Sequence, residues 1–121
     1  MKVLILEDAE ERIAQFKKNM GDGNLLAFTD KPKEAIDLLK EGKWDVLFLD
    51  HDLSGKFSVP SGKDTGYEVA TFLEVNEEFK PGTIVVHSMN PVGANNIMAA
   101  LKTAKRIPEA WTKTLQEVLK F

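Results

Sequence analysis

The sequence predicts a three-layer α/β domain, in which a doubly wound parallel sheet is covered by helices on both faces. Short apolar runs rich in β-branched residues alternate with longer segments of helical period, which is the pattern of strands joined by helical crossovers. The runs are apolar throughout, as expected for strands buried between two helical layers. A length of 121 residues suits one core, and no linker or composition break divides residues 1–121, so a single domain is expected.

The first strand and the first helix are expected at the start of the chain. Lys2 to Leu6 is a short apolar run that stops at charged residues, as a buried strand does. A helix is expected to begin at Asp8, because Glu11 stands three residues later as in a capping box. Its apolar stripe at helical spacing consists of Ile13, Phe16 and Met20.

Two further strands are expected on either side of a second helix. Residues 25–28 form a short apolar run, and residues 46–49 form the most hydrophobic run in the chain. Between them, Asp30 with Pro32 is expected to start the helix and Gly42 to end it.

A long loop is expected between the third strand and the third helix. Residues 53–66 hold three glycines, three serines and one proline, with almost no apolar period. Loops of this length inside compact domains are uncommon and often functional. A helix is expected at about 67–79, and a turn at 81–82 then leads into a strand at 83–86.

The last third of the chain predicts a helix, a short strand and a final helix. Helical periodicity covers about residues 92–103 and again 108–121. Residues 105–107 are expected to form a fifth strand that is short or degenerate.

Composition excludes several classes of protein. The net charge of −3 gives no argument for a duplex DNA surface, which usually carries clustered Lys and Arg. No apolar run approaches the ~20 residues that span a bilayer, and no signal peptide is expected, so no membrane partner is expected. The absence of cysteine excludes disulfides, thiol catalysis and Cys-ligated zinc, and it fits a cytoplasmic location.

Polar side chains follow three of the expected strands. In open α/β sheets, ligands bind beyond the carboxyl ends of the strands, where the strand order reverses. If the sheet has the order 2-1-3-4-5, strands one, three and four are neighbours, and the residues after them converge on one pocket. These residues are Glu7 and Asp8, then Asp50, His51 and Asp52, then His87, Ser88 and Asn90.

The acids of this pocket predict a divalent metal site. Crowded carboxylates such as Glu7, Asp8 and Asp50 repel one another and raise their pKa values unless a cation intervenes. Mg²⁺ or Mn²⁺ suits such oxygen ligands, and Asp52 is a fourth candidate. A bound ion attracts phosphate, which Ser88 and the backbone amides before the fourth helix are also placed to bind.

These residues resemble the receiver domain of bacterial response regulators, which has a flavodoxin-like sheet of order 2-1-3-4-5. The resemblance implies that Glu7 and Asp8 hold Mg²⁺ and that Asp50 accepts a phosphoryl group. It also implies that Ser88 reads the phosphorylation. Receivers carry a Lys, usually followed by Pro, after the fifth strand, and the nearest candidates here are Lys105 and Arg106.

Other features resemble a divergent group, the cyclic-phosphate processing receiver domains. They are the segments LDHDLSG and VVHSMNPVGANN, the long loop after Asp50 and the additional histidine before Ser88. The resemblance implies metal-dependent hydrolysis of cyclic phosphates on nucleotides or RNA ends. His51 and His87 would then be an acid–base pair or additional metal ligands, with Asp50 in the catalytic centre. Candidate phosphate contacts are Ser88, Asn90, Lys105 and Arg106.

Two other functions stay open at this point, as do simpler roles for single residues. Asp50 of a receiver would be phosphorylated by a histidine kinase, and a third possibility is a pocket that sequesters a nucleotide without cleaving it. Asp8 can serve as a helix cap and Asp52 as a turn residue. Lys105 and Arg106 can be solvated surface charges.

Overall fold

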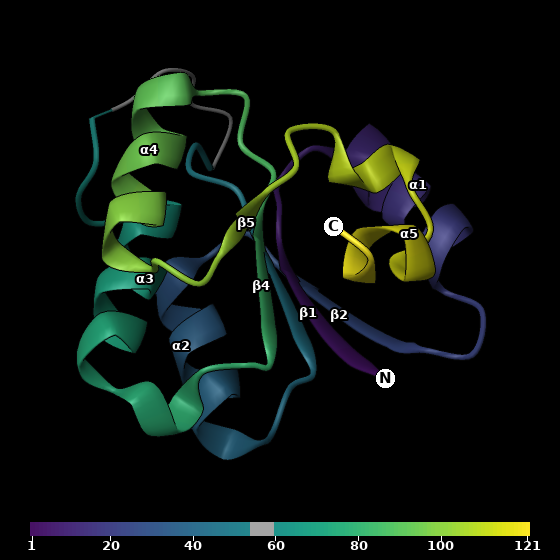
Figure 1. The fold of residues 1–121 in the computed structure, drawn as a ribbon, viewed down its shortest axis with the longest axis horizontal. Helices are drawn as coiled ribbons and strands as arrows, with labels where there is room; N and C mark the ends of the chain where they lie inside the picture. Colours follow the sequence, from purple (N-terminus) through teal and green to yellow (C-terminus); the bar gives the residue numbers. More distant parts are fainter. Residues whose placement is uncertain (54–59) are drawn as a thin grey trace.

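The computed structural model, which describes residues 1–53 and 60–121, confirms the α/β architecture and the strand order (Figure 1). Five parallel strands form one sheet in the order β2-β1-β3-β4-β5. The strands are β1 (Lys2–Leu6), β2 (Leu25–Thr29), β3 (Val46–Leu49), β4 (Thr83–Val86) and β5 (Lys105–Arg106). The helices are α1 (Glu10–Met20), α2 (Pro32–Glu41), α3 (Gly66–Val75), α4 (Pro91–Ala100) and α5 (Leu115–Leu119), with 3₁₀ turns η1 (Glu77–Phe79) and η2 (Ala110–Thr112).

Helices cover both faces of the sheet, so alternate residues of each central strand enter two separate cores. Leu4 and Leu6 of β1 face one way and pack in the core under α2, α3 and α4. Val3 and Ile5 face the other way and pack under α1, η2 and α5. Figure 1 shows these two layers on opposite sides of the sheet. No helix in the described part of the chain has the length and apolar character that a bilayer-crossing segment requires.

The register of the three central strands positions the site. Leu6 pairs with Leu49, and Leu49 pairs with Val86. The ladder continues one step further, because the N–H of Asp50 donates to the carbonyl of Leu6 at 3.2 Å and the N–H of His87 to that of Leu49 at 3.0 Å. The residues that follow the three strands therefore lie side by side at one edge of the sheet.

The predicted start of the first helix was wrong. Helix α1 begins at Glu10, and its N-cap residue Ala9 makes no side-chain cap. The backbone N–H groups of Asp8 and Ala9 instead donate to the Glu7 carboxylate, so the predicted capping box between Asp8 and Glu11 does not form.

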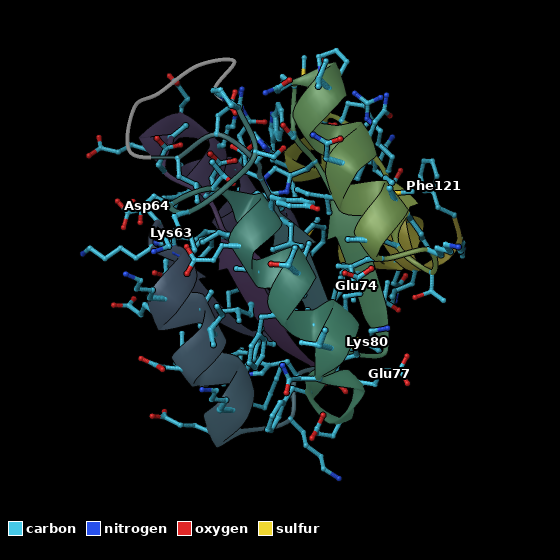
Figure 2. All side chains as sticks on the ribbon, turned by 90° about the vertical axis from the view of Figure 1, so that its left-hand side faces the viewer. Lys63, Asp64, Glu74, Glu77, Lys80 and Phe121 are labelled. Carbon is cyan, nitrogen blue, oxygen red and sulfur yellow. The ribbon has the colours of Figure 1, made fainter. Side chains whose placement is uncertain are left out.

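The predicted helices of the second half were too long. Helix α3 ends at Val75 and is followed by η1, where Lys80 and Glu77 form an ion pair of 3.3 Å on the surface (Figure 2). Helix α4 ends at Ala100. The segment expected as one helix over 108–121 is η2 followed by α5, because a capping box between Thr114 and Glu117 starts a new helix there. The predicted loop at 53–66 is described from residue 60 onward, and residues 54–59 lie outside the described part.

Gly66 allows α3 to begin directly against Asp50. A Cβ added at Gly66 would overlap the carbonyl oxygen of Asp50, whereas a Cβ at Gly62 would meet nothing within 4 Å. We expect Gly66→Ala to lower the free energy of unfolding by about 1–3 kcal/mol, as overpacking does. Gly62→Ala, the matched control, should change it by less than about 0.5 kcal/mol. Urea unfolding of both variants measures this, and equal effects would contradict the close packing.

Candidate functional site

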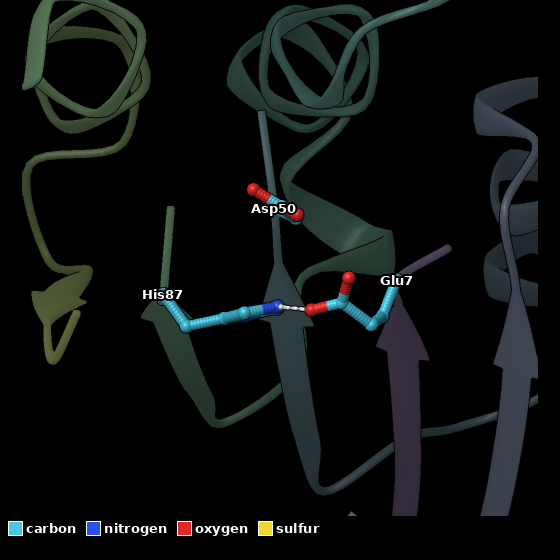
Figure 3. Close-up of side chains that lie close together, drawn as sticks. All are labelled: Glu7, Asp50 and His87. Atoms are coloured by element: carbon cyan, nitrogen blue, oxygen red, sulfur yellow. Dashed lines mark hydrogen bonds and ion pairs between the residues drawn. The ribbon is translucent and has the colours of Figure 1, made fainter. Parts of the chain in front are cut away.

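Three polar side chains from separate segments meet at the carboxyl edge of the sheet. Glu7, Asp50 and His87 follow β1, β3 and β4, and each offers a ligand atom within 4.8 Å of the others. All three are buried, with exposed fractions of 1%, 3% and 0%. Figure 3 shows Glu7 and His87 extending toward each other from the strands on either side of the one that ends at Asp50. The convergence expected from the strand order is therefore present for these three residues.

Glu7 is held by hydrogen bonds on both carboxylate oxygens. Its Oε1 lies 2.9 Å from Nε2 of His87, and its Oε2 accepts the N–H groups of Asp8 and Ala9, each at 3.1 Å. Burial by itself would raise the pKa of Glu7. The net pKa is nevertheless below its ordinary value, because burial is outweighed by the hydrogen bond and charge of His87, the N–H of Ala9 and the charge of Arg12. Glu7 is thus an oriented carboxylate that stays ionised.

Asp50 lies in a less favourable environment for a negative charge. Its Oδ1 accepts the backbone N–H of His51 at 2.8 Å. Burial, together with the negative charge of Glu7, raises the pKa of Asp50 to about 6, although His87, Arg12 and the His51 N–H act in the opposite direction. A cation bound here would relieve this energetic cost.

Arg12 of α1 is a site residue that the sequence analysis missed. Its Nη1 lies 3.7 Å from Glu7 Oε1 and 3.6 Å from Asp50 Oδ2. Its guanidinium stacks over the ring of Trp111, 4.3 Å from the centroid, which fixes the charge in place. One signal was available in the sequence, because Arg12 stands four residues before Phe16 and so shares the inward face of the helix.

The His87 ring is enclosed by aromatic side chains. Phe16, Trp111 and Phe48 approach it edge-on, with centroid distances of 5.3, 6.0 and 6.2 Å. Among the described residues its buried Nδ1 has no hydrogen-bond partner. The enclosure holds the ring so that Nε2 faces Glu7.

His51 lies in a second cluster, apart from these three side chains. Its Nδ1 is 2.6 Å from Asp52 Oδ1, and its Nε2 is 2.9 Å from Ser61 Oγ. Helix α4 packs against the ring at Gly93, where a Cβ would overlap the imidazole. His51 therefore does not belong to the convergent group of described side chains, because its ring contacts Asp52, Ser61 and α4, whereas the His87 ring contacts Glu7.

The remaining predicted acids and polar residues lie around the convergent three. Asp8 is half-buried, and neither it nor Asp52 belongs to the convergent group of described side chains. Ser88 is buried, and its Oγ accepts the Asn90 N–H at 3.1 Å. Asn90 caps α4 by accepting the N–H of Gly93.

The two cations expected to bind phosphate lie on β5, which pairs with β4. Lys105 Nζ lies 3.5 and 3.4 Å from the carbonyl oxygens of Val118 and Leu119. A positive charge at the C-terminal end of a helix such as α5 is stabilised by these carbonyl groups. Arg106 is exposed on β5. Pro108 follows β5 as in receivers, but the residue before it is the buried Ile107. Within the described structure, Arg12 rather than a β5 lysine is the cation beside Asp50.

Comparison with known proteins agrees with this architecture. A family model described as "Cyclic-phosphate processing Receiver domain" matches residues 3–103. Chemotaxis response regulator CheY4 of Vibrio cholerae is 21% identical, with a TM-score of 0.69 over 97% of each chain. The response regulatory domain of mrkE from Klebsiella pneumoniae is 17% identical, with a TM-score of 0.68 over 99% of this chain and 96% of that one.

A third solved structure, response regulator TrrA from Thermotoga maritima in complex with Mg²⁺-BeF, is 16% identical. Its TM-score is 0.67, over 98% of this chain and 96% of that one. At these identities the three structures establish the shared fold. No curated protein sequence matches the chain.

The raised pKa of Asp50 predicts how stability depends on pH. Between its unfolded pKa near 4 and its folded value of about 6, the folded protein binds more protons, so stability falls as pH rises through this window. Asn mimics the protonated acid and lacks this dependence. In EDTA, Asp50→Asn should be more stable than the wild type at pH 7 by about 1–3 kcal/mol, and equally stable near pH 4.

Urea unfolding at several pH values measures this difference. Asp37→Asn, at an exposed aspartate of α2, makes the same change in formal charge and is the matched control. A pH-independent difference between Asp50→Asn and the wild type would contradict the raised pKa.

Proposed function

The chain belongs to the cyclic-phosphate processing receiver domain family, and from this premise we propose that it hydrolyses cyclic phosphates at a divalent metal ion. Glu7 and Asp50 would hold the ion, with His87 beside them. The substrate would be a nucleotide or an RNA terminus that carries a cyclic phosphate. The convergence of these three buried side chains within 4.8 Å is the observation that carries the proposal.

The donor set fits a hard divalent cation. Mg²⁺ and Mn²⁺ prefer oxygen ligands such as two neighbouring buried carboxylates. The imidazole of His87 suits Mn²⁺ better than Mg²⁺. The structural relative TrrA was solved in complex with Mg²⁺-BeF, which supports the proposal of a divalent metal in this chain. Asp8 and Asp52 are proposed as outer ligands, through water or after rearrangement of their side chains.

The bound ion would polarise the phosphate, and this chain's own residues would orient the substrate and move protons. Hydrolysis adds water to phosphorus and breaks one ring P–O bond, and the oxygen that leaves phosphorus takes up a proton. Arg12 is placed to stabilise negative charge on the phosphate oxygens. Asn90 and Ser88 at the start of α4 are proposed phosphate contacts, whereas Lys105 is engaged at α5.

The two histidines take different roles in this proposal. His87 Nε2 lies 2.9 Å from Oε1 of Glu7, so we assign His87 to the metal centre. There it would act as a ligand or as the group that protonates the leaving oxygen. Asp52 lies in hydrogen-bond contact with the His51 ring and orients it, so we assign proton transfer to His51.

The alternative is a receiver phosphorylated on Asp50 by a histidine kinase. The position of Asp50 at the end of central strand β3 favours it. The buried Ile107 before Pro108 argues against it, since receivers carry a Lys at that point. A protein that binds a cyclic nucleotide without cleaving it is the third candidate.

Metal-dependent turnover tests the proposal. Incubated with 2′,3′-cyclic mononucleotides and cyclic dinucleotides and Mn²⁺ or Mg²⁺, the wild type should release the ring-opened monoester, and EDTA should abolish this. His87→Gln should lower the rate about 10²-fold, the scale of a lost proton-transfer group. Glu7→Gln should lose turnover, while Glu10→Gln, at an exposed position of α1, should keep it. Turnover unaffected by Glu7→Gln would exclude this centre.

A small phosphodonor separates the alternatives. With acetyl phosphate and Mg²⁺, we expect intact-mass spectrometry to show no lasting phosphoryl gain on the wild type, because the cation after β5 is replaced by Ile107. A gain that is lost in Asp50→Asn would favour the receiver function. Tight metal-dependent binding of an unchanged cyclic nucleotide would favour sequestration.

A further inference from the structure

We propose that Ser61, His51 and Asp52 form a nucleophilic relay, in which Ser61 Oγ attacks phosphorus electrophiles. The three side chains are joined in a line. Asp52 Oδ1 lies 2.6 Å from His51 Nδ1, and His51 Nε2 lies 2.9 Å from Ser61 Oγ. A nucleophile bonded to a base, with the base bonded to an orienting acid, is the arrangement that activates a serine.

The bonding partners determine the direction of each hydrogen bond. The Asp52 carboxylate only accepts, so the bond to it places a proton on Nδ1 of His51. In the neutral ring Nε2 then carries a lone pair and accepts the hydroxyl proton of Ser61. Asn96 Nδ2 donates to Ser61 Oγ at 2.7 Å, and Asn90 Nδ2 donates to Asp52 Oδ1 at 3.1 Å. Asn90 Nδ2 also lies 3.4 Å from His51 Nδ1, farther than from Asp52 Oδ1, so its N–H is assigned to the carboxylate. With Nδ1 donating to Asp52, Nε2 is placed to remove the proton of Ser61.

Burial separates the base from water but leaves the nucleophile near the surface. His51 is fully buried, with α4 packed against its ring at Gly93. Ser61 is half-buried and Asn96 is exposed, so an electrophile reaches Ser61 Oγ from the solvent side by displacing one amide. Lys63 and Asp64, shortly after Ser61 in the chain, also lie on the surface (Figure 2).

A tight turn holds Ser61 in this position. Thr65 Oγ1 donates to the carbonyl of Gly62 at 2.7 Å and accepts the N–H of the same residue at 3.3 Å. Asp64 adopts a left-handed φ of 63°, a conformation that costs energy at a non-glycine residue. The turn is fastened to the start of α3, since Thr65 caps that helix. The nucleophile is thus carried on a fixed turn, which preorganises it.

The proposed reaction is phosphoryl transfer to Ser61 and requires neither a metal ion nor an oxidant. The Ser61 Oγ–P bond forms as the bond from phosphorus to its leaving group breaks, and the hydroxyl proton passes to Nε2 of His51. When the leaving group is an alkoxide, His51 returns the proton to it, and water later hydrolyses the phosphoseryl ester. The relay therefore differs from the metal centre of the proposed hydrolysis, although His51 belongs to both proposals.

A fluorophosphonate tests the relay directly, because phosphorus acquires Ser61 Oγ and loses fluoride. Treated with diisopropyl fluorophosphate in EDTA, the wild type should gain one diisopropylphosphoryl group, mapped to Ser61 by peptide mass spectrometry. Ser61→Ala should remove this label. Ser58→Ala, at a serine three residues earlier, should keep it. Asp52→Asn should slow labelling by at least about 10²-fold, as loss of the orienting acid does in serine hydrolases.

The outcomes distinguish the relay from a structural network and from the metal proposal. Labelling of a residue other than Ser61, absence of labelling, or an unchanged rate in a folded Asp52→Asn variant would overturn the relay. Circular dichroism and urea unfolding establish which variants fold. Labelling in EDTA alongside absent cyclic-phosphate turnover would refute the metal proposal alone, and the opposite result would refute the relay alone.

Discussion

The lateral register of three buried strands is the constraint on which the site depends. Because Leu6, Leu49 and Val86 are paired across β1, β3 and β4, the next residue of each strand must lie at the same edge of the sheet. Two of those residues are acids with little access to water. The hydrogen bond of 2.9 Å between His87 and Glu7 and the nearby charge of Arg12 stabilise the negative charge of these carboxylates. Asp50 nevertheless retains a raised pKa.

The sequence predicted the strands better than the helices, for physical reasons. β1, β3 and β4 are short, mostly apolar runs bounded by charged residues or turns, a pattern typical of strands buried on both faces, and their predicted bounds match the structure. Helix ends depend on local competition. The Glu7 carboxylate accepts the N–H groups of Asp8 and Ala9, the first of which Glu11 was expected to accept in a capping box. Thr114 with Glu117 starts a new helix within 108–121.

The candidate site was predicted in part. The convergence of Glu7, Asp50 and His87 followed from strand order, which is a property of the chain's topology. The absence of His51 from this group did not, because the direction of its ring depends on contacts with Ser61, ten residues later, and with Gly93 of α4. Arg12 was missed for a similar reason, since its place against Trp111 depends on how the C-terminal segment packs on α1.

Trp111 touches two members of the charged cluster at once, as it stacks on Arg12 and meets the edge of His87. Asn19 of α1 also donates a hydrogen bond of 2.7 Å from its Nδ2 to the carbonyl oxygen of Trp111. Trp111 lies beyond residues 3–103, the span shared with the family. Displacement of η2 from α1 would remove a contact of the Arg12 guanidinium and a contact of the His87 ring together, so the positions of both groups depend on the C-terminal segment.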